Sequence, residues 1–530
     1  MIWALLAAAL SGLWLARGAL VRRLVRWRLG PFRVVVSRVD ERAPVRLTGE
    51  RRVAVVGGGV AGISAASALG GRGYRVTLFE ANAYLGGKLG SWPVQPAPDR
   101  TEWVSHGYHA FFRHYYNLNR FLDALGLRHG FRAISDYRIL LAGGGEISFG
   151  NLERTPGLNL LSMVTRGLVG LRYLMSAPAR DLMGVFLEYQ AGHVEPWLDR
   201  MSFAEFDRLV KLPPRLKVAF STFARAFFAD ESRMSMAELV KAFHFYFLGH
   251  DGGLIYDYPV HDYEVSLLKP IRGHLASLGV ATRLSSPVST LAWRDGLFRV
   301  NGEWFDRVVL AADVAGARRV LSTASGLEGL DRRLSSLQPG QRYAVLRLWL
   351  DRAPRGGLPV FVVTERHRVL DAITFLDRAE AESEDWVREH GGSVMELHSY
   401  AVPDDVPDQA VRDELLDELT HFLPELRVAT VRHEHLQLRR DFTAFHVGMS
   451  VERPETESGV PGLYCAGDWV RLPFPAMHLE AAFSSGLWAA NRILEADGLR
   501  EELVESVPLR GLMAGVRAPR ARQALLPREA

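Results

Sequence analysis

The sequence has a single cysteine, Cys465, among 530 residues. One thiol excludes any disulfide within the chain, so folding does not need an oxidising compartment. The chain also lacks internal repeats, which excludes a solenoid. Its histidines and acids show no metal-ligand spacing, and no Ser/His/Asp nucleophile motif occurs. We therefore expect neither a metal centre nor a hydrolase of that type.

The excess of basic over acidic residues is concentrated at the two ends of the chain. Residues 17–33 hold six arginines and no acid, and residues 509–530 hold five arginines and one glutamate. The remaining chain is therefore net −6, although the whole chain is net +4. This distribution argues against nucleic acid as a partner and favours ends that lie against anionic membrane lipid.

The N-terminal segment is unusually apolar. Residues 2–16 carry no charge, and the apolar character continues to Val21, close to the roughly 20 residues that span a bilayer. The arginines follow this run, whereas a secretory signal has its basic residues in front. We expect residues 1–28 to be a membrane anchor, with the catalytic body on the cytoplasmic side. A cleaved signal or an interfacial helix is the alternative.

The clearest local pattern lies between residues 52 and 80. An apolar strand is followed by Gly57, Gly59 and Gly62, which form G-x-G-x-x-G at the start of a predicted helix. Glycines there let a pyrophosphate approach the backbone amides. A second strand ends at Glu80, where an acid can bind the hydroxyls of a ribose. The segment predicts a dinucleotide-binding βαβ unit.

Apolar helical patterns dominate residues 159–248, and aromatic side chains gather between 223 and 247. These residues could form the core of a helical subdomain or line a long apolar tunnel, and periodicity does not distinguish the two. Further strands are expected within 280–291, 307–312, 343–350, 360–364, 394–400 and 462–468, with a last helix over 476–494.

Gly86, Gly87 and Lys88 indicate which dinucleotide binds. This turn resembles the extended signature of the amine oxidase and carotenoid desaturase superfamily, where a cation and backbone amides meet the phosphates of FAD. The superfamily usually has arginine there; Lys88 keeps the charge but loses the bidentate fork. No second strand-linked glycine motif for NAD(P)H occurs. An NAD dehydrogenase with a lone Rossmann unit is the rival interpretation.

Residues 462–468 resemble the G-L-x-x-A-G-D segment of the same superfamily. The resemblance implies that Gly467 and Asp468 bind the ribityl or phosphate part of FAD and that the next helix points at the flavin. A positive helix end would stabilise negative charge on reduced flavin. Residues 286–288 and 311–312 resemble the pieces that close the adenine pocket, which adds Val288 to the cofactor site.

Residues 102–118 indicate which part of this superfamily the chain resembles most. Their H-G-x-H-x-F-F run and following Y-x-N-L resemble the zeta-carotene desaturases, and still more the bacterial carotene desaturase/methyltransferases of the isorenieratene synthase type. The resemblance implies a long apolar polyene taken from the membrane and an electron acceptor such as a quinone or oxygen. Desaturation, isomerisation, ring aromatisation and ketolation share this scaffold, so the reaction stays open.

His106, His109 and His478 are the catalytic candidates, because their segments flank the flavin motifs. Hydride removal from a polyene leaves a delocalised cation that needs only a weak base. The same histidines could instead bind flavin or backbone. Residues 477–481 lack the aromatic cage of amine oxidases. An amine or protoporphyrinogen oxidase, or a lipid-binding flavoprotein without turnover, is an alternative.

The sequence thus predicts an α/β fold, with a Rossmann-type FAD domain of the two-dinucleotide-binding-motif class interleaved with a mixed-sheet and helical substrate domain. The function expected is that of an FAD-dependent oxidoreductase. The predicted ranges are 1–28 for the anchor, 50–100, 276–330 and 455–500 for the FAD domain, 101–275 and 331–454 for the substrate domain, and 501–530 for a basic tail.

Overall fold

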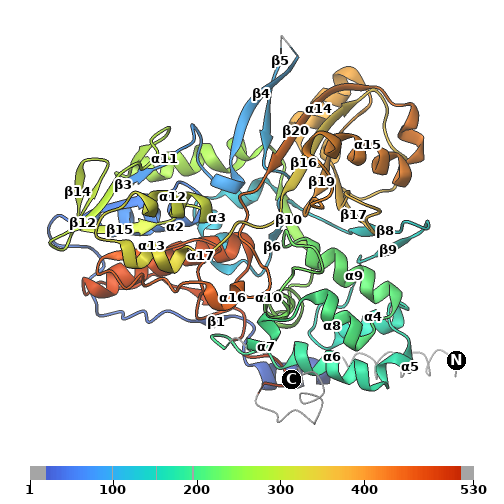
Figure 1. Ribbon diagram of the computed structural model, residues 1–530, viewed down its shortest axis with the longest axis horizontal. Coiled ribbons are helices and arrows are strands. Elements are labelled where there is room, and N and C mark those ends of the chain that lie inside the picture. Colours follow the sequence, from blue (N-terminus) through green and yellow to red (C-terminus); the bar gives the residue numbers. More distant parts are fainter. Residues whose placement is uncertain (1–18, 98–99, 151, 194–195, 515–530) are drawn as a thin grey trace, which may run out of the picture.

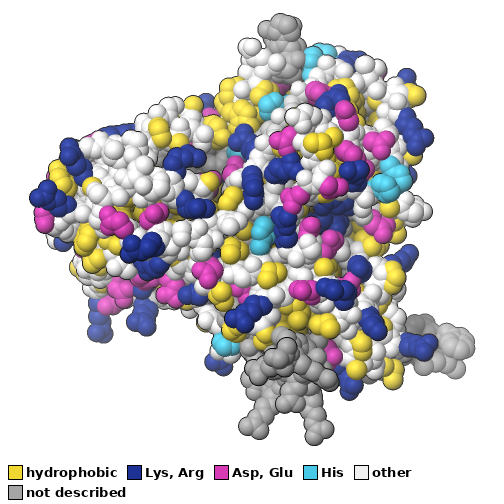
Figure 2. Space-filling view, in the orientation of Figure 1, with side chains coloured by type: hydrophobic (Ala, Val, Ile, Leu, Met, Phe, Trp, Pro, Cys, Tyr) yellow, Lys and Arg dark blue, Asp and Glu magenta, His cyan; other side chains and the backbone are white. Residues whose placement is uncertain are grey.

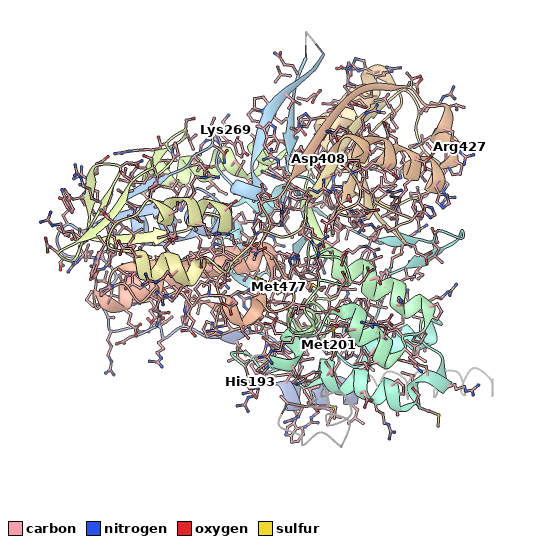
Figure 3. All side chains as sticks on the ribbon, in the orientation of Figure 1. His193, Met201, Lys269, Asp408, Arg427 and Met477 are labelled. Carbon is pink, nitrogen blue, oxygen red and sulfur yellow. The ribbon has the colours of Figure 1, made fainter. Side chains whose placement is uncertain are left out.

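The computed structural model describes residues 19–97, 100–150, 152–193 and 196–514. They form three lobes: a parallel sheet with its helices, a mixed sheet with helices α14 and α15, and a lobe made of helices (Figure 1). Met477, buried just before the last long helix, is labelled near the centre, where the lobes meet (Figure 3). The active-site candidates converge at this junction.

A five-stranded parallel sheet forms the first lobe. Val53 and Val55 face helices α2 and α17, whereas Ala54 and Val56 face the opposite side, so both faces are buried. Burial on both sides explains why these strands are continuously apolar. In sheet order the strands are β11 (Ala281–Arg283), β3 (Arg75–Phe79), β2 (Arg52–Val56), β15 (Arg307–Leu310) and β21 (Leu463–Cys465), with α2 (Val60–Gly71) and α17 (His478–Ala496).

An antiparallel meander and two helices cover the second face of this sheet. Phe298 and Phe305 of the meander are fully buried against Leu310 and its neighbours. The elements are β12 (Leu291–Arg294), β13 (Leu297–Val300), β14 (Glu303–Phe305), α12 (Val314–Ser322) and α13 (Glu328–Leu334).

The second lobe is a seven-stranded mixed sheet that joins distant parts of the sequence. Strand β8 pairs in parallel with β17, so the predicted substrate ranges 101–275 and 331–454 share one sheet. In sheet order the strands are β20 (Val431–Arg439), β16 (Tyr343–Leu350), β19 (Ser393–Ser399), β18 (Ala372–Phe375), β17 (Phe361–Thr364), β8 (Arg138–Leu140) and β9 (Glu146–Ser148). Its helices are α14 (Ala381–His390), α15 (Val411–Phe422), η5 (Leu376–Arg378), η6 (Asp408–Ala410) and η7 (Pro424–Val428).

The third lobe contains the helices of the aromatic-rich region. Phe220 and Phe243 stack on each other in its core, and Phe186 contacts both rings in tilted and edge-on arrangements. Its elements are α4 (Leu158–Thr165), α5 (Leu171–Leu174), α6 (Ala177–Leu187), α7 (Pro196–Asp199), α8 (Phe203–Val210), α9 (Pro214–Arg225), α10 (Met236–Phe243) and the π-helix η3 (His244–Leu248).

Shorter elements connect the lobes. They are η1 (Gly87–Leu89), the hairpin β4 (Ser91–Ala97) and β5 (Arg100–Ser105), a small sheet of β6 (Phe111–Phe112), β10 (Tyr256–Pro259) and β7 (Phe131–Ala133), α3 (Tyr116–Ala124), η2 (Leu127–Gly130), the π-helix η4 (Glu264–Leu268), α11 (Lys269–Ser277) and α16 (Met449–Glu452).

The two ends of the described chain lie together. Strand β1 (Val34–Val35) pairs antiparallel with β22 (Glu505–Ser506), and Val504 and Val507 are fully buried. Within the predicted basic tail, residues 501–514 pack onto the body, and residues 515–530 lie outside the described residues.

Most of the predicted anchor, residues 1–18, also lies outside the described residues, while residues 19–29 are helical. Within the described ranges no helix combines the length and apolar character needed to cross a bilayer. The face drawn in Figure 2 mixes Lys and Arg with Asp and Glu, so on this face the charges of the body form no extended basic patch.

Candidate cofactor and substrate site

The first glycine turn is shaped by the close approach of neighbouring backbone. Gly57 has φ +109°, and a Cβ there would come within 2.7 Å of the Ala311 carbonyl oxygen. A Cβ on Gly62 would overlap the Gly57 carbonyl oxygen, so only glycine fits at this position in the first turn of α2. A Cβ on Gly59, the N-cap residue of α2, would have no neighbour closer than 3.9 Å. Gly59 also lines the cavity, so a phosphate bound beside it would lie at the helix N-terminus.

The second glycine turn packs directly against the first. The Gly86 amide donates to the Gly58 carbonyl at 2.9 Å, and Gly59 and Gly86 form an isolated β-bridge. A Cβ on Gly87 would lie 3.0 Å from the Gly59 Cα. The two turns, at residues 57–62 and 86–88, thus form one concave surface of backbone, the glycine cradle. Its open space and backbone amides suit a bound pyrophosphate.

Glu80 is buried at the end of β3, beside this cradle. Its carboxylate accepts from the Gly58 amide at 2.7 Å and from the backbone and side chain of Asn82 at 2.7 and 2.8 Å. Val288 lines the same cavity. The structure therefore brings together the acid and the apolar wall that the sequence assigned to the adenosine end.

Lys88 and Asp468 meet from opposite ends of the sequence, with Nζ 3.5 Å from Oδ2. The Thr443 hydroxyl donates to Asp468 Oδ1 at 2.7 Å. Burial alone would raise the pKa of the Asp468 carboxyl, but Lys88 and this hydrogen bond lower it below its ordinary value. The Gly467 amide donates to the Ser485 hydroxyl, within α17, at 2.7 Å. The ionised acid can accept hydrogen bonds from cofactor hydroxyls.

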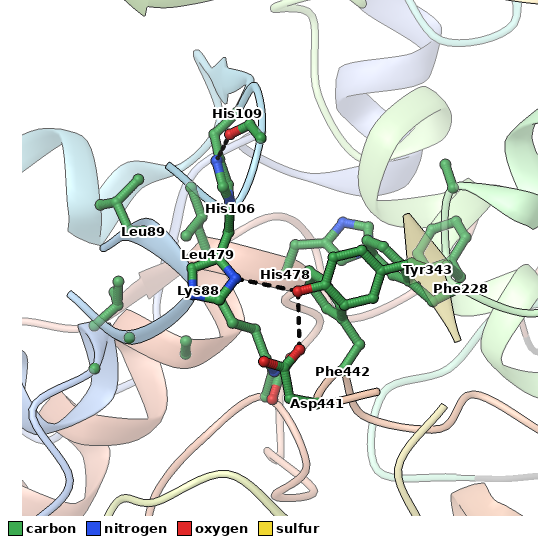
Figure 4. Close-up of a pocket in the computed structure, with 18 of the residues that line it drawn as sticks. Lys88, Leu89, His106, His109, Phe228, Tyr343, Asp441, Phe442, His478 and Leu479 are labelled. Atoms are coloured by element: carbon green, nitrogen blue, oxygen red, sulfur yellow. Dashed lines mark hydrogen bonds and ion pairs between the residues drawn. The ribbon is translucent and has the colours of Figure 1, made fainter. Parts of the chain in front are cut away.

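All three predicted histidines line one cavity (Figure 4). His106 Nδ1 lies 3.1 Å from the Tyr343 hydroxyl, which donates to Asp441 at 3.0 Å. Because that hydroxyl proton is already engaged, His106 is the donor in its contact with Tyr343. Burial holds the pKa of His106 well below 6.5, so the ring is neutral.

His109 has a fixed tautomer. Its Nδ1 lies 2.7 Å from the Gly107 carbonyl, an acceptor only, so Nδ1 carries the proton and Nε2 a lone pair. Burial lowers the pKa of His109 to about 4. The backbone amide of His109 donates to the Tyr263 hydroxyl at 2.8 Å, which holds the segment in place. His109 can therefore accept a proton at neutral pH.

His478 opens α17 with φ +49°, a left-handed conformation that is uncommon outside glycine. Its Nδ1 lies 2.9 Å from the Tyr246 hydroxyl, and its ring stacks on Phe227. Burial lowers the pKa of His478 to about 4, although Asp468 acts in the opposite direction. The sequence did not predict a role for Tyr246, because no motif distinguishes it from the other aromatic residues between 223 and 247.

Glu480 has a structural role. It is buried in α17 and accepts from the backbone amides of Asn117 and Leu118 at 2.8 and 3.1 Å, at the first turn of α3. Burial raises its pKa to about 7. The Asn117 side chain also donates to the Glu505 carbonyl. The Y-x-N-L motif thus ties α3, α17 and the C-terminal segment together.

The cavity, of about 680 Å³, continues from the glycine cradle into the helical lobe. Residues of the aromatic stretch have two different environments. Phe223 and Phe247 line the cavity, whereas Phe245 belongs to the helical core and is buried against His114. Other lining residues of this end are Phe149, Met163, Leu216, Ala219, Phe220, Phe227, Phe243 and Phe361.

Together, the paired glycine cradle, the buried Glu80 beside it and helix α17, which begins at the cavity, fit a dinucleotide-binding flavoprotein. Comparison with known proteins identifies the family: residues 60–494 match the model of the flavin containing amine oxidoreductases, and the chain belongs to this family. It is an FAD-dependent oxidoreductase of the carotenoid desaturase-like type.

Two curated relatives are similar along most of their length. A carotenoid phi-ring synthase of Streptomyces griseus is 37% identical, over 89% of this chain and 93% of the relative. A carotenoid phi-ring synthase of Chlorobaculum tepidum is 27% identical, over 88% and 92%.

Among solved structures, an oxidoreductase from Methanosarcina mazei is 16% identical with a TM-score of 0.61, covering 84% of this chain and all of the other. Putrescine oxidase has 15% identity and a TM-score of 0.59, over 84% and 99%. These structures share the fold. The predicted FAD cofactor and oxidoreductase class are confirmed, whereas the roles of individual site residues stay predictions.

Proposed function

We propose that this protein oxidises a cyclic carotenoid end group to an aromatic phi ring. The observation that carries the proposal is the single cavity that joins the cofactor cradle to an aromatic, apolar end in the helical lobe. The names of the two similar relatives supply the product class. An elongated hydrocarbon can be held there by ring contacts alone, without polar groups.

The chemistry has a definite balance. Converting a trimethylcyclohexene ring to a trimethylbenzene ring removes four hydrogens, and one of two geminal methyl groups must move to the next carbon. Bound FAD supplies the two-electron oxidant for each of two dehydrogenations. His109, with its Nε2 lone pair in the cavity, takes a proton from the substrate cation. The apolar walls exclude water that would trap the cation.

An amine substrate is less well supported. The acids that line the described cavity, Glu80, Asp313, Asp441 and Asp468, are shared with the cradle and its surroundings. No acid of the described residues lines the cavity from α4, α9 or η3. An ammonium group there would lose its hydration without a counter-charge, which is costly.

Pigment analysis in a bacterial host that makes β-carotene tests the proposal. Expression of this chain should yield a carotenoid lighter by four hydrogens per converted ring, with an aromatic end group in its proton NMR spectrum. His109→Gln should give folded, yellow protein and only traces of the new pigment. Desaturated acyclic products from a lycopene-making host, or unchanged pigment in both hosts, would contradict aromatisation.

We further propose that residues 19–29 lie against the membrane from which the polyene enters. Leu20, Leu24 and Trp27 are 60–79% exposed, and their i, i+4, i+7 spacing places them on one helix face. Arg22 and Arg23 stand beside them. Arg28 donates to the Leu512 carbonyl at 2.9 Å, so the helix is held on the body. A quinone in the same membrane, or oxygen, would reoxidise the cofactor.

Cell fractionation tests the membrane contact. Removing residues 1–28 should shift the protein from membranes toward the soluble fraction with its FAD retained. Serine at positions 20, 24 and 27 in the full chain should shift it less, since the segment before them stays. A full-length protein that is wholly soluble would refute the contact.

A further inference from the structure

Three side chains from separate elements form a hydrogen-bonded chain beside the cofactor site. The hydroxyls of Tyr115 and Tyr246 are 2.9 Å apart, and the Tyr246 hydroxyl is 2.9 Å from His478 Nδ1. All three residues line the cavity. Tyr246 lies in the π-helix η3 and His478 has positive φ, two local irregularities that are frequent at functional sites.

Counting protons gives the chain a direction. If Tyr115 donates to Tyr246 and Tyr246 donates to His478 Nδ1, each hydroxyl proton has an acceptor and only the His478 Nε2–H remains. In the reverse direction, two buried groups remain unpaired: the Tyr115 proton and the Nε2 lone pair. Unpaired buried polar groups are costly, so the first direction is favoured. Among the described residues, His478 Nε2 is buried and has no partner.

We propose that His478, through its Nε2–H, donates a hydrogen bond to the isoalloxazine ring of bound FAD, and that Tyr246 is the positioning residue that fixes this tautomer. A carotenoid hydrocarbon has no acceptor, whereas isoalloxazine has carbonyl oxygens and ring nitrogens. His478 shares the cavity with Lys88, Gly467 and Asp468, which are predicted to bind the phosphate and ribityl parts of FAD, and it opens the helix predicted to point at the flavin. His109 has the opposite hydrogen-bonding role, because its Nε2 carries a lone pair and accepts a hydrogen bond or a proton.

The consequence is a property of the flavin itself. A donor directed at the ring stabilises the negative charge that reduction adds, so the oxidant is stronger with it than without it. This inference goes beyond the proposed reaction and needs only the bound FAD. It is measured without carotenoid, so its failure is separate from failure of the proposed function.

The test is the two-electron midpoint potential of the FAD-loaded protein, titrated against reference dyes. Tyr246→Phe removes one hydroxyl and keeps the ring among Phe112, Phe223 and Phe227. Reduction should become about tenfold less favourable, which is about 30 mV for a two-electron couple. FAD should stay bound, since the cradle is untouched.

Companion variants separate positioning from packing. His478→Leu should lower the potential at least as far, and the double variant with Tyr246→Phe no further, because both remove the same donor. His478→Gln, which offers an amide N–H, should keep most of the wild-type value. Tyr115→Phe should shift the potential less than Tyr246→Phe does.

Three results would overturn the proposal: a wild-type potential in Tyr246→Phe, additive shifts in the double variant, or equal potentials in the Leu and Gln variants of His478. If Tyr246→Phe does not retain FAD, the Leu and Gln comparison decides alone.

Discussion

The two ends of the cavity are built on different principles. At the cofactor end, backbone meets backbone: a Cβ on Gly57, Gly86 or Gly87 would crowd neighbouring backbone atoms at 3.0 Å or less. At the helical end, the wall is made of side chains such as Phe223, whose neighbours come from separate helices. The first end depends on local backbone conformation, and the second on packing. We therefore expect substitutions at the first to remove the cofactor and substitutions at the second to change the substrate only.

Gly62→Ala should have the largest effect. Its Cβ would overlap the Gly57 carbonyl oxygen, and both atoms belong to backbone that cannot move aside without opening the turn. We expect purified protein without FAD, or no soluble protein, measured by flavin absorbance per chain. Gly71→Ala is the matched control on the same helix: a Cβ there meets nothing within 4 Å, and stability should hold or rise by up to about 1 kcal/mol. Full FAD occupancy in Gly62→Ala would show that the turn can relax.

The same contrast explains which parts could be predicted from sequence. A glycine motif specifies backbone conformation within a few residues, so β2 lies where expected, although α2 already begins at Val60, inside the predicted glycine turn. Strand β16 also matches, because its buried run is apolar apart from Arg347, which pairs with Glu396. The predicted strand over 280–291 is instead split between β11 and β12. The sequence did not predict strand β20, because its many charged and polar residues are not typical of a strand. The strand forms because it pairs with β16.

The site shows the same limit. Lys88 and Asp468 could each be predicted from a short motif. Only the folded structure shows that their charged atoms lie 3.5 Å apart. The Tyr246 contact with His478 joins residues far apart in sequence, and no local pattern encodes it.

His109→Gln should lower turnover by about 10²-fold, the usual size for a lost general acid–base group, with FAD still bound. Because burial holds the pKa of His109 near 4, the base is free at neutral pH and becomes protonated only as the pH falls toward that value. The wild-type rate should therefore be flat between about pH 6 and 8 as far as His109 is concerned. Rates measured with flavin-normalised enzyme check this. An unchanged rate in the variant would show that another group accepts the proton from the substrate cation.

Glu80→Gln should weaken FAD affinity by about ten- to a hundredfold, because a hydrogen bond to a charged group contributes about 1.5–3 kcal/mol. The amide oxygen can still accept from the Gly58 amide, so the turn itself should persist. Fluorescence of FAD released on dilution gives the dissociation constant. Asp313→Asn is a useful comparison, since Asp313 lines the cavity but its carboxylate caps α12. Equal losses in both variants would argue against a specific ribose contact by Glu80.

Ala219→Phe should have the smallest effect on the protein and a selective one on the substrate. Ala219 lies on α9 and lines the helical end of the cavity, so a ring there takes up space without approaching the glycine cradle. We expect full FAD occupancy, an unchanged midpoint potential and roughly tenfold lower conversion of the polyene, the size of about 1.4 kcal/mol in binding. Arg215→Phe places the same ring on the exposed side of α9 and should convert pigment normally. If Ala219→Phe loses FAD, the two ends are coupled through packing and the contrast between them fails. If it converts pigment at the wild-type rate, the polyene does not occupy the helical end.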